Sequence, residues 1–187
     1  MSAFPWLEVS ANIANAAAIL FATRNSVHTW WLSIVGCALF GVLFYTSRLY
    51  ADMLLQGFFI ATSGVGWWKW LAKSDGTVLE VTRMAWRSFS LVVLASLLVA
   101  AGYGYALWRF TDAYAPFIDS LVLALSVAAQ LLLMVRKYDS WWLWLAVNTL
   151  SVALFTNRGL YLTAVLYFGF WVNAIVALVR WKRLIRA

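Results

Sequence analysis

The chain has 187 residues, of which 65% are hydrophobic and only 11% are charged, and its formal net charge is +7. A soluble domain carries roughly 25% charged residues, so this composition excludes an ordinary soluble protein and favours an integral membrane protein. The basic residues lie in short connectors between apolar runs rather than along a polar face. We therefore expect the lipid bilayer, and no nucleic acid, as a partner.

Apolar runs long enough to cross a bilayer, about 20 residues each, follow one another along the chain. The first run has no basic leader and carries Glu8, Asn12 and Asn15, so we expect a retained helix and not a cleaved signal peptide. The sequence therefore predicts an all-α integral membrane protein with seven transmembrane helices. The predicted spans are 4–23, 29–47, 50–71, 86–109, 117–136, 140–156 and 159–181.

Seven crossings place the two termini on opposite sides of the membrane, and the basic residues divide unequally between these sides. One side collects eleven of them, and the other has only Arg48, Arg109 and Arg158. Cytoplasmic connectors are enriched in Lys and Arg. We therefore expect a multi-pass membrane protein with its N-terminus outside and its C-terminus in the cytoplasm.

Two parts of the chain match when the sequence is shifted by 111 residues. Trp30-Trp31-Leu32 falls on Trp141-Trp142-Leu143, and Lys69-Trp70 falls on Arg180-Trp181. The match predicts two three-helix repeats in the same orientation, joined by one extra helix in a 3+1+3 plan. The predicted domains are a first repeat (1–72), a connector with the fourth helix (73–112) and a second repeat (113–187).

Polar and aromatic side chains recur on one face of several predicted helices, although polar groups are costly inside a membrane. Trp and Tyr rings stack on aromatic ligands and attract cations, and Asn and Gln amides suit hydroxyl or carboxamide groups. The stripes therefore predict a binding site for a planar, partly polar ligand. Its candidate residues are Asp52, Gln56, Ser63, Trp67, Gln130, Trp141, Trp144, Asn148, Tyr167 and Trp171.

The same side chains have simpler interpretations. Asn, Gln and Ser also hold helices together through hydrogen bonds between them, so each polar residue is as compatible with packing as with binding. Acids near helix starts complement the helix dipole. Tryptophans near helix ends commonly anchor the protein at the membrane interface, and we expect this of Trp30, Trp31, Trp70, Trp142 and Trp181.

The sequence holds few groups for chemistry. It has one histidine, His28, and one cysteine, Cys37, which is too few for a nucleophile with its base or for a clustered metal site. A glycine-rich phosphate loop is also absent from the sequence. We therefore expect no enzyme activity, no metal or cofactor, and no ATP-driven step in this chain.

Several segments resemble the PnuC family of vitamin transporters, and the resemblance covers nearly the whole chain. They are Trp6-Leu7-Glu8, Leu39-Phe40-Gly41, Leu49-Tyr50-Ala51-Asp52 with Leu55-Gln56, Gly66-Trp67-Trp68-Lys69-Trp70, Asp119-Ser120, Arg136-Lys137-Tyr138, Trp141-x-x-Trp144-x-x-x-Asn148 and Gly159-Leu160-Tyr161. The resemblance implies a fold like an inverted relative of the SWEET sugar transporters and a homotrimer. Its site positions correspond here to Gln56, Trp67, Trp144, Asn148 and Tyr161.

The resemblance further implies facilitated diffusion of a vitamin across the bacterial inner membrane, with a cytoplasmic kinase that traps the substrate by phosphorylation. Nicotinamide riboside is the most common family substrate, and thiamine and riboflavin are alternatives. This chain departs from the family by having Gly36 and Ser63 where asparagines are common, which keeps thiamine open. Alternatives from other classes are a membrane scaffold, whose stripes only pack helices, and an intramembrane enzyme.

Overall fold

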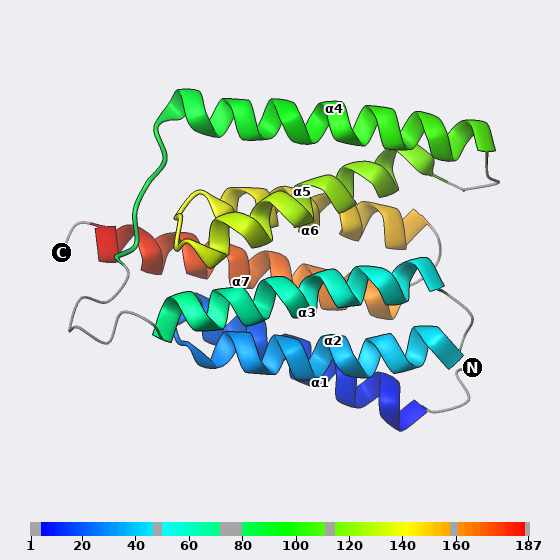
Figure 1. Cartoon of the computed structure of the whole chain (residues 1–187), viewed down its shortest axis with the longest axis horizontal. Coiled ribbons are helices and arrows are strands. Elements are labelled where there is room, and N and C mark those ends of the chain that lie inside the picture. Colours follow the sequence, from blue (N-terminus) through cyan, green and yellow to red (C-terminus); the bar gives the residue numbers. More distant parts are fainter. Residues whose placement is uncertain (1–4, 47–49, 72–79, 111–114, 158–160, 186–187) are drawn as a thin grey trace. The chain divides into compact units, whose positions relative to one another are not determined.

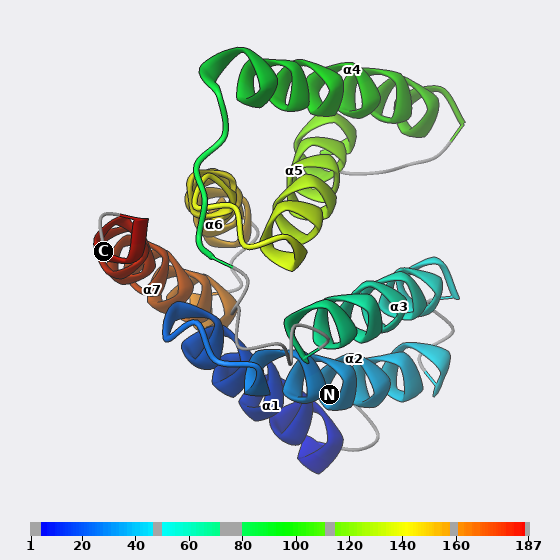
Figure 2. The same cartoon turned by 60° about the vertical axis from the view of Figure 1, so that its left-hand side comes forward.

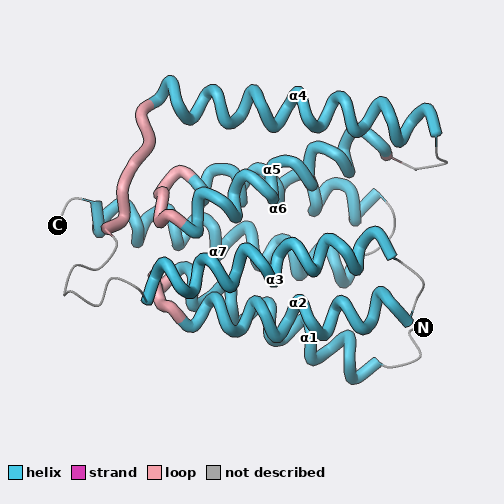
Figure 3. Tube along the Cα trace, in the orientation of Figure 1, coloured by secondary structure: helices cyan, strands magenta, loops and turns pink. Residues whose placement is uncertain are grey.

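The computed structural model describes residues 5–46, 50–71, 80–110, 115–157 and 161–185. Within these residues the chain forms seven α-helices and no β-strand (Figure 1; Figure 3). They are α1 (Pro5–Thr23), α2 (His28–Thr46), α3 (Tyr50–Leu71), α4 (Trp86–Phe110), α5 (Pro116–Met134), α6 (Ser140–Asn157) and α7 (Tyr161–Ile185).

The predicted all-helical class with seven helices is confirmed, and the bounds differ mostly by one or two residues. The largest difference is at the end of α7, which runs to Ile185 and not to residue 181. Lys182 and Arg183 lie in its last turn, where positive charge complements the helix dipole. The helix therefore continues past the end of its apolar run.

Three helical segments are long and apolar enough to cross a bilayer by length and composition alone, among the residues that the structure describes. They are Trp86–Phe110, Pro116–Met134 and Ala164–Ile185. Val9–Thr23, His28–Val42 and Ser140–Leu154 are shorter apolar helices. Polar residues such as Asn12, Asn15 and Asn148 interrupt these helices, which lowers their hydropathy relative to α4 and α5.

The chain divides into two compact units, residues 1–80 and 81–187. In the first unit α2 packs against both α1 and α3. In the second unit α4 packs on α5, α5 on α6 and α6 on α7, so the fourth helix belongs with the helices that follow it (Figure 2). The three predicted domains stay a prediction.

The contact between α4 and α5 depends on small side chains. The buried residues of α4 are Ser96, Ala100 and Gly104, which recur every four residues and form one stripe. A Cβ atom at Gly104 would lie 2.7 Å from Cδ1 of Phe117 on α5, so only glycine permits this approach. Lipid tails are as apolar as the helix side chains, so the hydrophobic effect does not hold two helices together inside a bilayer. Small residues at this spacing let the helix backbones come close and pack instead.

The turn from α1 to α2 ends the first helix in a left-handed residue. Asn25 has φ +54°, its N–H donates to the carbonyl of Ala22, and the N–H of Ser26 donates to the carbonyl of Phe21. This pair of bonds satisfies the last carbonyls of a helix and requires a positive φ at the first residue beyond the cap.

The turn from α5 to α6 repeats these bonds 111 residues later. Arg136 has φ +50°, its N–H donates to Leu133, and the N–H of Lys137 donates to Leu132. Because both turns close with the same bonds at the same offset, the geometry supports the 3+1+3 repeat plan, which stays a prediction.

Candidate functional site

Trp144, Asn148 and Ser151 lie on one face of α6, because residues four and three apart share a helix face. Asn148 and Ser151 are buried. Trp144 is half-buried and packs against the apolar cluster between α5 and α6. An aromatic face therefore lies one turn from a buried amide, which is the arrangement that a planar ligand with a polar substituent requires.

The apolar cluster fixes the rotation of α6. Its members are Leu125, Ala129 and Leu132 from α5 and Leu143 and Val147 from α6, and all are buried. Because Val147 directly precedes Asn148 and points into this cluster, Asn148 is turned about 100° away from it. Gln130, a candidate on α5, is buried as well.

Trp171 on α7 is anchored to a different part of α6. Its indole N–H donates to Oγ1 of Thr149 at 3.1 Å, and its ring stacks on Phe168 at 5.8 Å between centroids. Thr149 also donates to the carbonyl of Leu145, so its hydroxyl connects the two helices. Because successive residues diverge by about 100°, Trp171 is held on a face of α6 rotated from Asn148.

Thr149 was absent from the predicted stripes. A single threonine on an apolar helix gives no periodic signal, and its role depends on which residue of the neighbouring helix reaches it.

The two tyrosine candidates lie on α7. Tyr167 lies one turn before Trp171 and is half-buried, whereas Tyr161 at the helix start is 68% exposed.

The ring of Trp141 on α6 packs against α7. Its ring meets Trp181 edge to face, with 5.5 Å between centroids and an interplanar angle of 78°. Trp30 and Trp70, at the positions 111 residues earlier, form the same pair at 5.3 Å and 85°. Edge-to-face pairs contribute about 0.5–1.5 kcal/mol beyond the area that they bury.

These pairs correct the expectation for the tryptophans near helix ends. Trp30, Trp70 and Trp181 are buried, so their assignment as interface anchors is wrong. Each packs against a partner indole of the neighbouring helix, which the sequence of one helix does not reveal. Trp31 and Trp142 are 40% and 46% exposed, as an interface anchor requires.

In the first unit the candidates lie on α3. Ser63 is fully buried, and its hydroxyl has no hydrogen-bond partner among the residues that the structure describes. Gln56 is half-buried, with its Cβ close to Gly41 of α2, and Trp67 is exposed. The side chain of Asp52 lies outside the described residues.

Asn15 of α1 occupies the space beside Gly36 of α2. A Cβ atom at Gly36 would lie 2.5 Å from Nδ2 of Asn15, so the amide fills the place of a side chain at position 36. Asn15 donates to the carbonyl of Ala11 at 3.0 Å, which leaves its second N–H and its oxygen for other partners. An amide is thus present at this place, but it comes from the first helix.

Charged groups of the second unit gather in the turn between α5 and α6. Arg136 is buried there, and desolvation lowers the pKa of its guanidinium to about 10, so it stays charged at neutral pH. Asp139, also buried, accepts a hydrogen bond from the N–H of Met84. Among the described residues, no three His, Cys, Asp or Glu side chains group as metal ligands would.

Comparison with known proteins places this arrangement in a family. The family described as nicotinamide mononucleotide transporter matches residues 5–183. The chain belongs to this family. The resemblance drawn from the sequence motifs and the predicted transporter class are thereby confirmed, and the chain is a multi-pass membrane transporter.

Relatives of the family cover most of the chain. The nicotinamide riboside transporter PnuC of Escherichia coli (strain K12) is 26% identical over 189 residues, which is 87% of this chain and 79% of the relative. The protein of the same name from Neisseria mucosa is 25% identical over 194 residues, or 97% of this chain and 73% of the relative.

A crystal structure of the vitamin B3 transporter PnuC shares the fold, with a TM-score of 0.74. At 24% identity it covers 97% of this chain and 82% of that chain.

Proposed function

We propose that this protein carries nicotinamide riboside across the bacterial inner membrane by facilitated diffusion. The observation that carries the proposal is the family match over residues 5–183, together with relatives named for this substrate that align along 87–97% of the chain. The sequence lacks a phosphate-binding loop that would couple transport to ATP. No enzyme activity is proposed.

The chemistry of the candidate residues suits this substrate. Nicotinamide riboside has a cationic aromatic ring, a carboxamide and a ribose. Trp144 offers an aromatic face for the ring, and Asn148 and Gln130 offer amides that both donate and accept hydrogen bonds. We propose these three as the contribution of the second unit. The further proposed residues are Asp52, Gln56, Ser63, Trp67, Trp141, Tyr161, Tyr167 and Trp171.

The amide of Asn15 bears on the choice of substrate. The second helix has Gly36 where the family commonly has an asparagine, so it lacks that amide. This difference by itself favours thiamine, a cation without ribose. Because the side chain of Asn15 fills that space, an amide is retained and the argument for thiamine weakens. The orientation with the C-terminus inside, the homotrimer and trapping by a kinase remain part of the proposal.

The deciding experiment is uptake of labelled nicotinamide riboside into proteoliposomes that contain the purified protein, with thiamine and riboflavin as competitors. We expect saturable uptake that dissipating the ion gradients leaves unchanged, and competition by unlabelled nicotinamide riboside alone. Competition by thiamine with equal strength would reassign the substrate. Absence of binding and uptake of all three by folded protein would favour the scaffold alternative.

A further inference from the structure

The segment that leads into α4 is bound to the turn between α5 and α6. Thr82 and Lys137 form a parallel β-bridge, in which the N–H of Thr82 donates to the carbonyl of Arg136 and the N–H of Tyr138 donates to the carbonyl of Thr82. These two backbone bonds measure 3.2 and 2.9 Å. Residues 81–84 therefore run beside the turn and are joined to it by an isolated β-bridge at Thr82.

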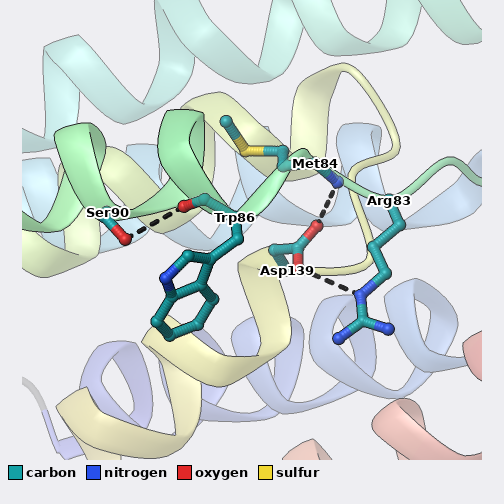
Figure 4. A network of polar contacts seen from close by, with 5 residues as sticks. All are labelled: Arg83, Met84, Trp86, Ser90 and Asp139. Atoms are coloured by element: carbon teal, nitrogen blue, oxygen red, sulfur yellow. Dashed lines mark hydrogen bonds and ion pairs between the residues drawn. The ribbon is translucent and has the colours of Figure 1, made fainter.

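Side chains secure this pairing (Figure 4). Oδ2 of Asp139 accepts the N–H of Met84 at 2.7 Å, and its Oδ1 lies 3.9 Å from Nε of Arg83. The side chain of Asp139 is only 7% exposed and that of Arg83 is 68% exposed, so the hydrogen bond contributes more than the ion pair. Arg83 also lies over the ring of Tyr138, 5.9 Å from its centroid.

Further side-chain contacts join the segment to the body of the second unit. Nζ of Lys137 donates to Oγ1 of Thr82 at 2.9 Å. Val81 is buried, and Met84 packs against the apolar cluster between α5 and α6. The segment is thus held by backbone, polar and apolar contacts over only four residues.

The related turn in the first unit serves as an internal comparison. It closes with the same backbone bonds, but its counterpart of Asp139 is His28, 111 residues earlier. His28 is exposed and accepts the indole N–H of Trp31, which belongs to its own helix. Among the described contacts of the two turns, only the second turn therefore has an acid, Asp139, that binds a separate segment of the chain.

We propose that residues 81–84 and the turn at 136–139 form a clip that keeps α4, α5 and α6 one rigid body throughout the transport cycle. Asp139 is its positioning residue, because it directly precedes α6, which carries Trp144 and Asn148, and accepts a hydrogen bond from Met84 in the segment before α4. The expected effect on uptake rests on the proposed transport of nicotinamide riboside. The expected rigidity of α4, α5 and α6 does not depend on that proposal.

The first test locks the clip. Thr82→Cys and Lys137→Cys replace the two residues that the β-bridge holds side by side, so a disulfide between them would lock the clip. We expect the protein oxidised with copper phenanthroline to take up nicotinamide riboside as fast as its reduced form, with the Thr82→Cys variant as control. Failure to cross-link, or uptake that oxidation blocks and a reductant restores, would overturn the proposal.

The second test weakens the clip through Asp139→Ala. We expect hydrogen exchange at the amides of Met84 and Tyr138 to accelerate about tenfold or more, because a buried charged acceptor is lost. The maximal uptake rate should fall with the Kd for substrate unchanged, and the disulfide should restore it. His28→Ala, the control at the related position, should change neither exchange at these amides nor uptake.

Unchanged exchange or unchanged uptake in Asp139→Ala would remove the positioning role. Asp139→Leu has a similar shape and no hydrogen-bond acceptor, so it decides the same question if the alanine variant does not fold. Wild-type protein that takes up no nicotinamide riboside would contradict the proposed function alone. Cross-linking and amide exchange would still decide the clip, since neither needs substrate.

Discussion

At the scale of the residue, the candidate site residues differ in burial and in the side chains that they contact. Asn148 is buried one turn from the half-buried Trp144, and the apolar cluster between α5 and α6 fixes the rotation of the helix that carries both residues. Two other candidate tryptophans contact neighbouring helices. The ring of Trp141 packs against Trp181, and the indole N–H of Trp171 donates to Thr149. The binding contribution should therefore differ sharply among the tryptophans.

Trp144→Ala should weaken binding of nicotinamide riboside by about 1–3 kcal/mol, as loss of a stacking ring does elsewhere. Calorimetry on the detergent-purified protein measures the change in Kd. Trp142→Ala is the matched control, because Trp142 lies two residues away and is exposed. Equal affinity of folded Trp144→Ala and wild-type protein would remove Trp144 from the site.

Asn25→Gly should stabilise the protein by about 0.5–1 kcal/mol, because φ +54° is a conformation that glycine adopts without strain. The substitution also removes a buried Oδ1 that has no hydrogen-bond partner among the described residues. Asn25→Ala should instead destabilise by about 1 kcal/mol. Thermal unfolding in detergent gives both values, and a loss of stability in the glycine variant would contradict the backbone argument.

At the scale of the element, each unit has one helix pair closed by two indoles. Trp30 on α2 meets Trp70 on α3, and the contact requires Gly66, whose added Cβ would lie 2.6 Å from the ring of Trp30. In the second unit Trp141 and Trp181 close α6 and α7 in the same way. Close approach at glycine therefore determines how α2 and α3 pair.

Gly66→Ala should destabilise the protein by about 1–3 kcal/mol, since a methyl group there overpacks the contact with Trp30. Gly64→Ala on the same helix meets nothing within 4 Å and should stabilise by up to about 1 kcal/mol through helix propensity. Thermal unfolding of both variants measures the contrast. Combining Gly66→Ala with Trp30→Phe should recover part of the loss, and equal effects of the two alanines would contradict the close contact.

At the scale of the whole molecule, charge distribution sets the orientation in the membrane. Eleven of the fourteen basic residues fall on one side of the seven predicted crossings, and the clip and the end of α7 lie on that side. Basic connectors resist translocation, so this side is expected to stay in the cytoplasm.

A reporter domain fused after Ala187 should therefore be active only as a cytoplasmic reporter. A fluorescent protein that folds in the cytoplasm and an alkaline phosphatase that folds outside it give opposite signals. Phosphatase activity from the C-terminal fusion would contradict the predicted orientation. Replacing Lys182 and Arg183 by Gln should leave the orientation intact, because nine basic residues remain on that side.

The sequence by itself determined the class, the number of helices and nearly all of their bounds. Bilayer thickness requires apolar runs of about 20 residues, and charged connectors such as Arg136-Lys137 mark where the runs end. It also determined the family, because the aromatic and amide motifs are spread along the whole chain. The class, the helix bounds and the family motifs are properties of single segments, so they can be predicted from one sequence without knowing which segments meet in space.

Only the tertiary structure decided the roles of individual side chains. Each of these roles depends on two segments that meet in space. The examples are the burial of Trp30, Trp70 and Trp181, the amide of Asn15 beside Gly36, the hydrogen bond from Trp171 to Thr149 and the clip at Asp139. Helical periodicity gives the face of a residue but not the neighbour that faces it. A stripe therefore predicted which side chains share a helix face, and the tertiary structure shows which neighbouring side chains they contact.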